Sequence, residues 1–337
     1  MRASAKPYPW LAALLSFVWP GTGHAYVGRP LRGAVGMGGG VAFLAGAVIV
    51  TVTLAADRGV LMASAIMLTS LGVRGAVAVD AFRVAPARKR GERAGITALW
   101  VVGFALASSA LTVATRAWLV EAYKIPGGSM SPTLLVGDHI FAEKLTPFRR
   151  GPARGEPWVF AFPEQPTQNF VKRVIALPGD VLEVRGGHPW LNGWEVPHCH
   201  VGRATSHYEQ AAHVGEVFVE WLDGSAYILF LEGAVSSEVQ GPFRAKAGEY
   251  WVLGDNRNNS HDSRMWFGGL GGGVRRDRFH GRAITVWLGD PDLSRGGMSL
   301  VGTPVLPREF SNLASELARC LREAPALAAT VPPAGGK

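Results

Sequence analysis

One serine of this chain lies where it could act as a nucleophile. Ser129 follows Gly127 and Gly128 and precedes Pro132 by three positions. The glycines leave the backbone with little steric cover, so a peptide carbonyl could approach the hydroxyl closely. Two common serine patterns, GxSxG and S-x-x-K, are absent, because position 131 is serine and position 132 is proline. Taken alone, such a serine is more often an ordinary turn residue.

A lysine among apolar neighbours offers a matching base. Lys172 lies between Val171 and Val174 in a segment expected to be a strand. Such a lysine usually lies on the solvated face, but if it points inward, burial disfavours the ammonium and lowers the pKa. A base for neutral pH needs a pKa about three units below ~10.4, which is ~4 kcal/mol, and burial can supply that. Arg173 would then point toward water on the opposite face of the strand.

A dense polar run follows a third apolar segment. Positions 254–264 read GDNRNNSHDSR, directly after the expected strand Tyr250–Leu253. This run is either a solvated loop or a scaffold that holds a neighbouring active site in place. His261 within it is a rival base for Ser129, because histidine is the commoner partner of serine. We favour the competing interpretation, in which His261 is a variable loop residue beside Asp262.

The elements that must position these groups are short and β-like. From about 120 to 292, β-type runs alternate with Gly, Pro and Asp, which predicts an all-β domain. The expected strands are His139–Lys144, Trp158–Phe162, Phe170–Ala176, Val181–Val184, Glu216–Trp221, Ala226–Leu231, Tyr250–Leu253 and Arg282–Leu288. Residues 307–324 have helical spacing, and no function is assigned to them.

The first 116 residues have the character of a membrane domain. Three stretches, 33–56, 59–82 and 94–115, are long enough to cross an apolar bilayer core of ~30 Å at ~1.5 Å per residue. The basic connection 83–93 is expected in the cytoplasm, so the third span would carry everything after about 117 outward. Residues 1–32 hold a shorter apolar run, which we interpret as an interfacial or half-spanning segment.

Charge and cysteine content exclude other classes of function. The net charge of +8 is explained by basic residues beside the apolar spans, and no nucleic-acid recognition motif accompanies it. The only cysteines, Cys199 and Cys320, lie 121 positions apart, so we expect no disulfide framework. At most His198 and His200, which flank Cys199, could share a metal on a strand; we expect a surface loop there and no metal.

Together, the three clusters resemble the bacterial type I signal peptidase family. The resemblance rests on Pro-x-Gly-Ser-Met-x-Pro-Thr, Lys-Arg-Val-x-x-x-Pro-Gly-Asp and Gly-Asp-Asn-Arg-x-Asn-Ser-x-Asp-Ser-Arg, and it covers roughly 112–290. It implies a mostly-β catalytic domain, with a second β subdomain inserted at about 186–247. Together with the apolar stretches, the expected fold class is N-terminal transmembrane helices followed by this extracytoplasmic domain. The expected division of the chain is an interfacial or half-spanning segment 1–32, a membrane domain 33–116, a catalytic domain 117–292 and a tail 293–337.

The resemblance also assigns roles to the catalytic residues. Ser129 matches the nucleophile and Lys172 the general base of a Ser/Lys dyad. Ser260 matches a serine whose hydroxyl orients that lysine. Asp262 and Arg264 match an ion pair that steadies the site.

The substrate-contacting positions carry one departure from the family pattern. Ile125 and Val171 match residues that line shallow apolar pockets for small side chains, and Gly127 and Met130 join them in the predicted substrate site. Many family members have a serine at position 127 that donates to the oxyanion. Glycine removes that donor, and losing one donor can cost ~10²–10³ in rate. The inserted region also lacks the cysteine pair of some relatives, since Cys199 is its only cysteine.

The activity implied is removal of signal peptides from exported preproteins, after small residues and through an acyl-enzyme. No cofactor or nucleic acid is expected. The expected partners are signal-peptide-bearing preproteins and the lipid bilayer, on which Trp118 and Trp158 would rest. We expect a monomer in the bacterial cytoplasmic membrane, multi-pass, with its catalytic domain on the extracytoplasmic side. The alternative, suggested by Gly127, is a catalytically impaired homologue that acts as a membrane scaffold.

Overall fold

The chain divides into two compact units. The computed structural model describes residues 8–85, 118–208, 211–233, 238–323 and 330–333, with isolated positions between 102 and 113. The first unit is Met1–Leu119 and the second is Val120–Lys337. The predicted tail, 293–337, therefore belongs to the same compact unit as the β domain.

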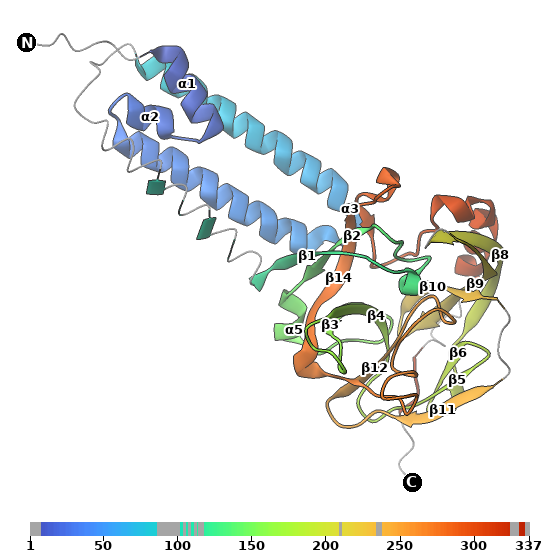
Figure 1. Cartoon of the computed structure of the whole chain (residues 1–337). Coiled ribbons are helices and arrows are strands. Elements are labelled where there is room, and N and C mark those ends of the chain that lie inside the picture. The colour runs from blue at the N-terminus through green and yellow to red at the C-terminus, as the bar shows by residue number, and fades with distance from the viewer. Residues whose placement is uncertain are drawn as a thin grey trace, which may run out of the picture. The chain divides into compact units, whose positions relative to one another are not determined.

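The described part of the first unit is helical. It contains α1 (Pro9–Val18), α2 (Thr22–Tyr26) and α3 (Pro30–Val84). Arg32 Nη1 lies 3.5 Å from Asp80 Oδ2, although a straight helix would hold these residues ~70 Å apart. The long helix α3 therefore folds back on itself, and Figure 1 shows its two halves side by side.

The structure describes two of the three predicted membrane segments. The stretches 33–56 and 59–82 fall on the two halves of α3, whereas 94–115 lies outside the described residues apart from isolated positions. Within the part of the chain that the structure describes, no helix combines the length and the apolar character needed to cross a membrane.

The N-terminal segment packs through hydrogen bonds onto α3. Gly23 N donates to Ser16 Oγ at 3.1 Å, which joins α2 to α1. Arg74 Nη1 donates to Val18 O at 2.8 Å, which joins α3 to the end of α1. The run predicted as interfacial or half-spanning is thus two short helices attached to α3.

The second unit is mostly β, which confirms that part of the predicted fold class (Figure 1). The largest sheet among the described residues has the order β1-β2-β14-β3-β4-β12-β13, and β15 pairs with β14. Its strands are β1 (Val120–Lys124), β2 (His139–Glu143), β3 (Pro157–Ala161), β4 (Asn169–Ala176), β12 (Glu249–Leu253), β13 (Val274–Arg275), β14 (Phe279–Leu288) and β15 (Met298–Ser299). The short helices of this unit are η2 (Gly128–Met130), α5 (Leu145–Arg149), η3 (Arg276–Arg278) and η4 (Leu293–Arg295).

Two smaller sheets are formed by strands between residues 181 and 244, most of which lie in the predicted insertion 186–247; these two sheets are called the inserted subdomain below. The first has the order β11-β5-β6-β7 and the second β10-β9-β8. Their strands are β5 (Val181–Arg185), β6 (His188–Leu191), β7 (Trp194–Glu195), β8 (His198–Tyr208), β9 (Ala211–Leu222), β10 (Ser225–Glu232) and β11 (Val239–Arg244). The prediction of a surface loop at 198–200 was wrong, because these residues begin β8 and pair with β9.

Strand β3 is buried on both faces, which corrects one expectation. Trp158 packs with Phe279 on one face, while Val159 faces a second cluster that contains Ile140. The side chain of Trp158 is completely buried, and its Nε1 donates to Glu156 Oε2 at 3.1 Å. Trp158 therefore cannot rest on a lipid surface, whereas Trp118 is 71% exposed.

Arg173 does not point toward water as predicted. It is buried, and its Nε and Nη2 donate to the Asp255 carboxylate at 2.8 and 2.5 Å. Its guanidinium also lies 4.3 Å from the ring centroid of Tyr227 on β10. The prediction failed because the inserted subdomain covers the face of β4 that the local pattern assigned to solvent.

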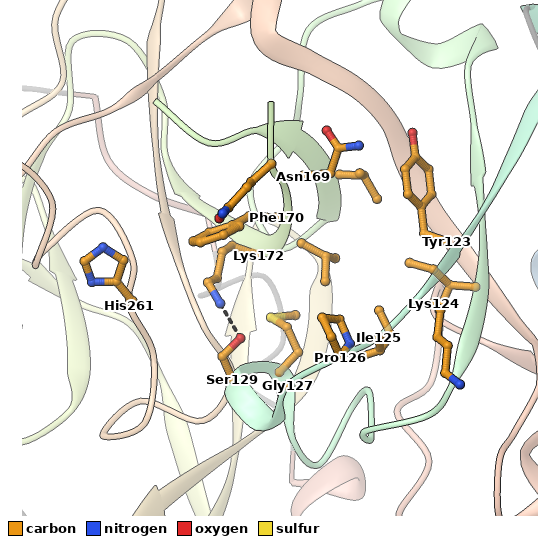
Figure 2. Close-up of a pocket in the computed structure, with 15 residues that line it drawn as sticks. Tyr123, Lys124, Ile125, Pro126, Gly127, Ser129, Asn169, Phe170, Lys172 and His261 are labelled. Carbon is orange, nitrogen blue, oxygen red and sulfur yellow. Dashed lines mark hydrogen bonds between the residues drawn. The ribbon is translucent and has the colours of Figure 1, made fainter. Parts of the chain in front are cut away.

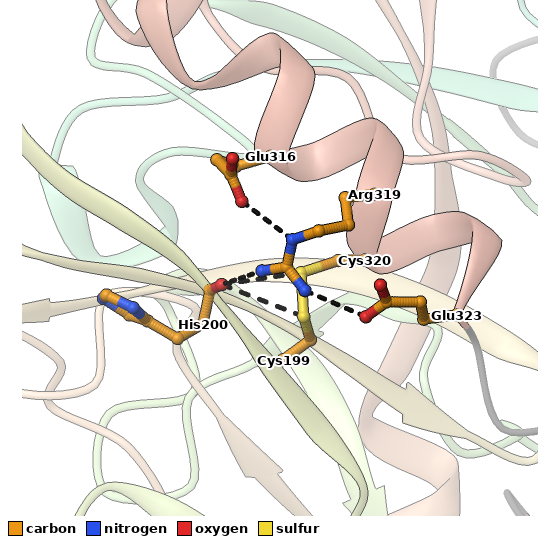
Figure 3. The surroundings of a disulfide bond; sticks show 6 residues. All are labelled: Cys199, His200, Glu316, Arg319, Cys320 and Glu323. Atoms are coloured by element: carbon orange, nitrogen blue, oxygen red, sulfur yellow. Dashed lines mark hydrogen bonds and ion pairs between the residues drawn. A yellow bond between two sulfur atoms is a disulfide. The ribbon is translucent and has the colours of Figure 1, made fainter.

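The C-terminal segment is fastened to the inserted subdomain. Helices η5 (Arg308–Leu313) and α6 (Ala314–Arg322) place Phe310 and Leu317 in one core cluster with residues of β9 and β10. A disulfide joins Cys199 on β8 to Cys320 on α6 (Figure 3). We expected no disulfide framework, and this expectation was wrong because these two cysteines form one disulfide. The helix α6 folds back over β8 and brings the two distant positions together.

Candidate active site

An open cavity lies between β4 and the segment that joins β1 to η2. It has a volume of about 450 Å³, and its apolar wall includes Ile125, Ile140 and Val159, each at most 3% exposed. Figure 2 shows Ser129 and Lys172 together on one side of this cavity, with Ile125 and Pro126 on the other. The arrangement places a polar pair at the edge of a small apolar chamber.

The nucleophile candidate is held by a pinned turn. Ser129 occupies the middle of η2, directly after a segment tied to the chain before β2. Ile125 N donates to Asp138 O at 2.8 Å, and Gly137 N donates to Ile125 O at 2.9 Å. Arg295 in turn holds the Asp138 carboxylate, with Nη2 at 2.7 Å from Oδ2. These bonds hold the backbone that leads into the turn of Ser129.

Lys172 points into the protein toward that hydroxyl. It lies on β4 opposite Trp158 of β3 and is only 3% exposed. A hydrogen bond joins its Nζ to Ser129 Oγ, as Figure 2 shows. Burial lowers the pKa of Lys172 to about 8, although the carboxylates of Asp262 and Asp255 raise it. A substantial fraction of this amine is therefore neutral near pH 7–8, as a general base requires.

A buried ion pair lies close to this lysine. Arg264 Nε donates to Asp262 Oδ1 at 2.8 Å and its Nη2 to Oδ2 at 2.9 Å, with Asp262 fully buried. Gly254 N also donates to Asp262 Oδ2, at 3.0 Å. Burial raises the pKa of Asp262, but Arg264 and these donors outweigh it and the net direction is downward. The structure thus brings Asp262 and Arg264 together at the end of β12.

Ser260 lies close to Ser129 and to Asp262. Ser260 is 9% exposed, and its hydroxyl contributes to the lowered pKa of Asp262. A Cβ at Gly254 would collide with both the Ser260 side chain and Ser129 O. Only glycine fits at that point. The orienting role of Ser260 toward Lys172 stays a prediction.

The predicted substrate residues converge on the cavity. Ile125, Gly127, Met130 and Val171 all line it, and Met130 is completely buried. Gly127 has extended backbone angles, with φ −142° and ψ 160°, and no atom lies within 4 Å of where a Cβ would stand. A larger residue at position 127 would therefore meet open space.

His261, the rival base for Ser129, is exposed to solvent, unlike Lys172. His261 lines the same cavity, but its side chain is 55% exposed, and its Nε2 lies 3.6 Å from Glu164 Oε2. Its ring also packs edge-on against Phe162. Figure 2 shows it on the far side of Lys172 from Ile125. The amine that bonds the Ser129 hydroxyl is that of Lys172.

Sequence reasoning missed the residues that support the nucleophile from behind. Asn256 N donates to Ser129 O at 3.1 Å, and Tyr208 from β8 packs against Gly128. Asn256 belongs to the polar run whose composition already indicated a possible scaffold. Tyr208 carries no local signal, because its position depends on how the inserted subdomain folds back.

Comparison with known proteins points to one family. The family model described as signal peptidase, peptidase S26, matches residues 97–288. The chain is similar to signal peptidase I of Pseudomonas fluorescens, with 32% identity over 211 residues that cover 54% of this chain and 69% of that protein. Signal peptidase I of Pseudomonas aeruginosa is 33% identical over 203 residues, with the same shares covered. A solved signal peptidase I from Enterococcus faecalis has 25% identity and a TM-score of 0.23, covering 40% of this chain and 97% of that one.

Proposed function

Because the chain belongs to the signal peptidase family, peptidase S26, we propose that it is a membrane-bound serine endopeptidase that removes N-terminal signal peptides from exported preproteins. Ser129 is the nucleophile and Lys172 the general base. The observation that carries this assignment is the hydrogen bond between the Ser129 hydroxyl and a buried amine whose pKa burial lowers to about 8.

The reaction is acyl transfer in two halves. Neutral Lys172 takes the proton from Ser129 as Oγ bonds the scissile carbonyl carbon, and the resulting ammonium then gives a proton to the leaving amine as the C–N bond breaks. The mature protein leaves with a new N-terminus. Lys172 next takes a proton from water as the water oxygen bonds the acyl carbonyl carbon. The resulting ammonium returns a proton to Ser129 Oγ as the ester bond breaks, which releases the signal peptide with a new carboxyl group. No cofactor enters either half.

The substrate binds as an added strand. Residues 170–172 of β4 pair with β3 on one side, while β12 pairs with β4 only at positions 173, 174 and 176. The other backbone edge at Val171 thus faces the cavity without a described strand beside it, opposite the Ile125 segment. Backbone hydrogen bonds to such an edge orient an extended peptide. The apolar chamber then accepts small side chains before the cleaved bond.

The enzyme works at the outer surface of the cytoplasmic membrane. The uncharged stretches 33–56 and 94–115, and the mostly apolar stretch 59–82, support a multi-pass anchor. The Cys199–Cys320 disulfide supports an extracytoplasmic catalytic unit, because such bonds persist in oxidising compartments. The exposed rings of Trp118 and Trp287 suit a lipid interface. Release of the full chain from membranes by alkaline extraction would refute this attachment.

A cleavage assay tests the assignment. The full-length chain in detergent is incubated with several preproteins, beside the variants Ser129→Ala, Lys172→Ala and His261→Ala. We expect cleavage after a small residue by the parent and by His261→Ala, and none by the other two. Cleavage by Lys172→Ala, or loss with His261→Ala alone, would contradict the dyad. Absence of cleavage by the parent with every preprotein would favour the scaffold alternative, which the intact Ser129–Lys172 bond disfavours.

A further inference from the structure

The peptide bond between Gly128 and Ser129 is held in place through its carbonyl oxygen. In a planar trans peptide, the C=O and the N–H point in opposite directions. Gly128 O accepts from Ser131 N at 3.0 Å and from Asn256 Nδ2 at 3.4 Å. When position 127 is glycine, the Ser129 N–H is the donor left for an oxyanion. Its orientation is set by the groups that hold Gly128 O on the opposite side of the same peptide.

Asn256 holds this peptide from behind, and Tyr208 holds Asn256. Asn256 Nδ2 donates to Tyr208 Oη at 2.8 Å, and its backbone N donates to Ser129 O at 3.1 Å. The Tyr208 ring also lies against the same peptide: a Cβ added to Gly128 would be 2.7 Å from Tyr208 Cδ2. One side chain of the inserted subdomain thus contacts the nucleophile turn directly and also through Asn256.

Tyr208 is itself held in one place. Its hydroxyl accepts from Asn259 Nδ2 at 2.9 Å and donates to the Glu232 carboxylate. Its ring stacks on His213 with centroids 3.8 Å apart, and His213 Nδ1 lies 2.6 Å from Glu232 Oε1. Burial and the neighbouring Glu232 raise the pKa of Tyr208 to about 12, so the hydroxyl keeps its proton.

We propose that Tyr208 is a positioning residue through which the inserted subdomain aligns the oxyanion-binding peptide of the active site. It touches no reacting atom and acts through Asn256 and the Gly128–Ser129 peptide. The inference rests on the proposed function, because it concerns the transition state of that reaction. It gives the inserted subdomain a part in catalysis that its distance along the chain does not reveal.

Tyr208→Phe tests this proposal, because it keeps the ring against Gly128 and removes only the hydroxyl. We expect kcat to fall about tenfold, since one misaligned donor costs less than the ~10²–10³ of a donor removed. KM should stay within about twofold, because the substrate edge at Val171 is untouched. Tyr250→Phe is the matched control: it loses a hydroxyl from a ring packed on Phe279, and it should retain the parent kcat.

A double-variant cycle separates alignment from general loosening of the fold. Gly127→Ser adds a hydroxyl donor at the oxyanion site, so its factor of gain in kcat should be larger in Tyr208→Phe than in the parent. Equal factors in both backgrounds, or an unchanged kcat in Tyr208→Phe, would overturn the proposal. If Tyr208→Phe does not fold, Glu232→Gln loosens the same hydroxyl and must show the same kcat loss and the same larger gain. All assays use a preprotein whose cleavage Ser129→Ala abolishes, so a failure here leaves the proposed function standing.

Discussion

At the scale of single residues, the proposed mechanism depends on a lysine that the fold keeps out of water. Lys172 is 3% exposed, and its pKa falls to about 8 because burial outweighs the nearby carboxylates. A charged ammonium in this position opposes folding, whereas the neutral amine that catalysis needs does not. The active site is therefore less stable than the same site with an apolar residue, which is a common cost of catalytic groups.

Lys172→Met should stabilise the protein while abolishing activity. The folded pKa of about 8 lies below the ordinary value of 10.5, so the unfolded chain binds more protons between these values. The gain should be largest below about pH 8, about 3 kcal/mol as an upper estimate, and should shrink as the pH rises toward ~10.5. Thermal unfolding at several pH values measures it. Arg173→Met, which leaves Asp255 buried and unpaired, should instead destabilise by about 3–5 kcal/mol.

Gly127→Ser should increase the rate of cleavage. The backbone at position 127 is extended and no atom lies within 4 Å of where a Cβ would stand, so the side chain fits without displacement. A hydroxyl there would add an oxyanion donor, and we expect kcat to rise about tenfold or more. Gly127→Ala is the control, because it makes the same change of backbone freedom without the hydroxyl. An equal gain from both variants would contradict the oxyanion explanation.

At the scale of elements, the end of β12 brings the parts of the site together. Gly254 follows this strand, and its N–H donates to the Asp262 carboxylate while its Cα faces Ser129 O and Ser260. The close approach of two backbone segments is possible because glycine has no side chain. Asp262 of the ion pair, Ser260 and the nucleophile turn all contact this glycine.

Gly254→Ala should damage both stability and activity. Its Cβ would collide with Ser129 O, a backbone atom that cannot move without shifting η2. We expect a loss of about 1–3 kcal/mol, as for other overpacked sites, and a fall in kcat of more than about tenfold. Thermal unfolding and the preprotein assay measure these two effects. Gly127→Ala, which meets open space, should leave the melting temperature unchanged; equal melting temperatures for both variants would refute the contact.

The C-terminal helix depends on a cross-link to the inserted subdomain. Cys320 on α6 is fully buried and bonded to Cys199 on β8, 121 positions away. Cys320→Ser should lower stability by about 2–4 kcal/mol, because the unfolded chain loses a long closed loop. Melting with and without reductant checks this: reductant should destabilise the parent and leave the variant unaffected. A parent that is insensitive to reductant would show that the bond does not form.

At the scale of the whole molecule, local patterns predicted much of the catalytic unit. Each of the expected strands is present, because alternating apolar residues and Gly, Pro and Asp turns report on short-range structure. The sequence left two interpretations of the polar run 254–264 open, a solvated loop or a scaffold, and its hydrogen bonds around the site favour the scaffold. The Ser129–Lys172 contact followed from the combined motifs rather than from either residue alone.

What the sequence could not predict lies between distant segments. Arg173 and Trp158 were assigned to solvent or lipid, although further layers of the fold cover both. The Cys199–Cys320 bond and the Tyr208–Asn256 contact join positions 121 and 48 apart, and no local period encodes such pairs. In each of these cases, the contact depends on how segments distant in the sequence pack against one another. Patterns of period two specify which face a side chain takes, and the tertiary fold specifies what covers that face.

The central claim is that neutral Lys172 activates Ser129, and the pH dependence of kcat/KM for preprotein cleavage tests it most directly. Between about pH 5 and about pH 10, the account predicts that kcat/KM rises roughly tenfold per pH unit and levels off through an inflection at about 8, the pKa that burial imposes on Lys172. His261→Ala should leave this inflection in place. An inflection that disappears in His261→Ala, with activity remaining in Lys172→Ala, would contradict it.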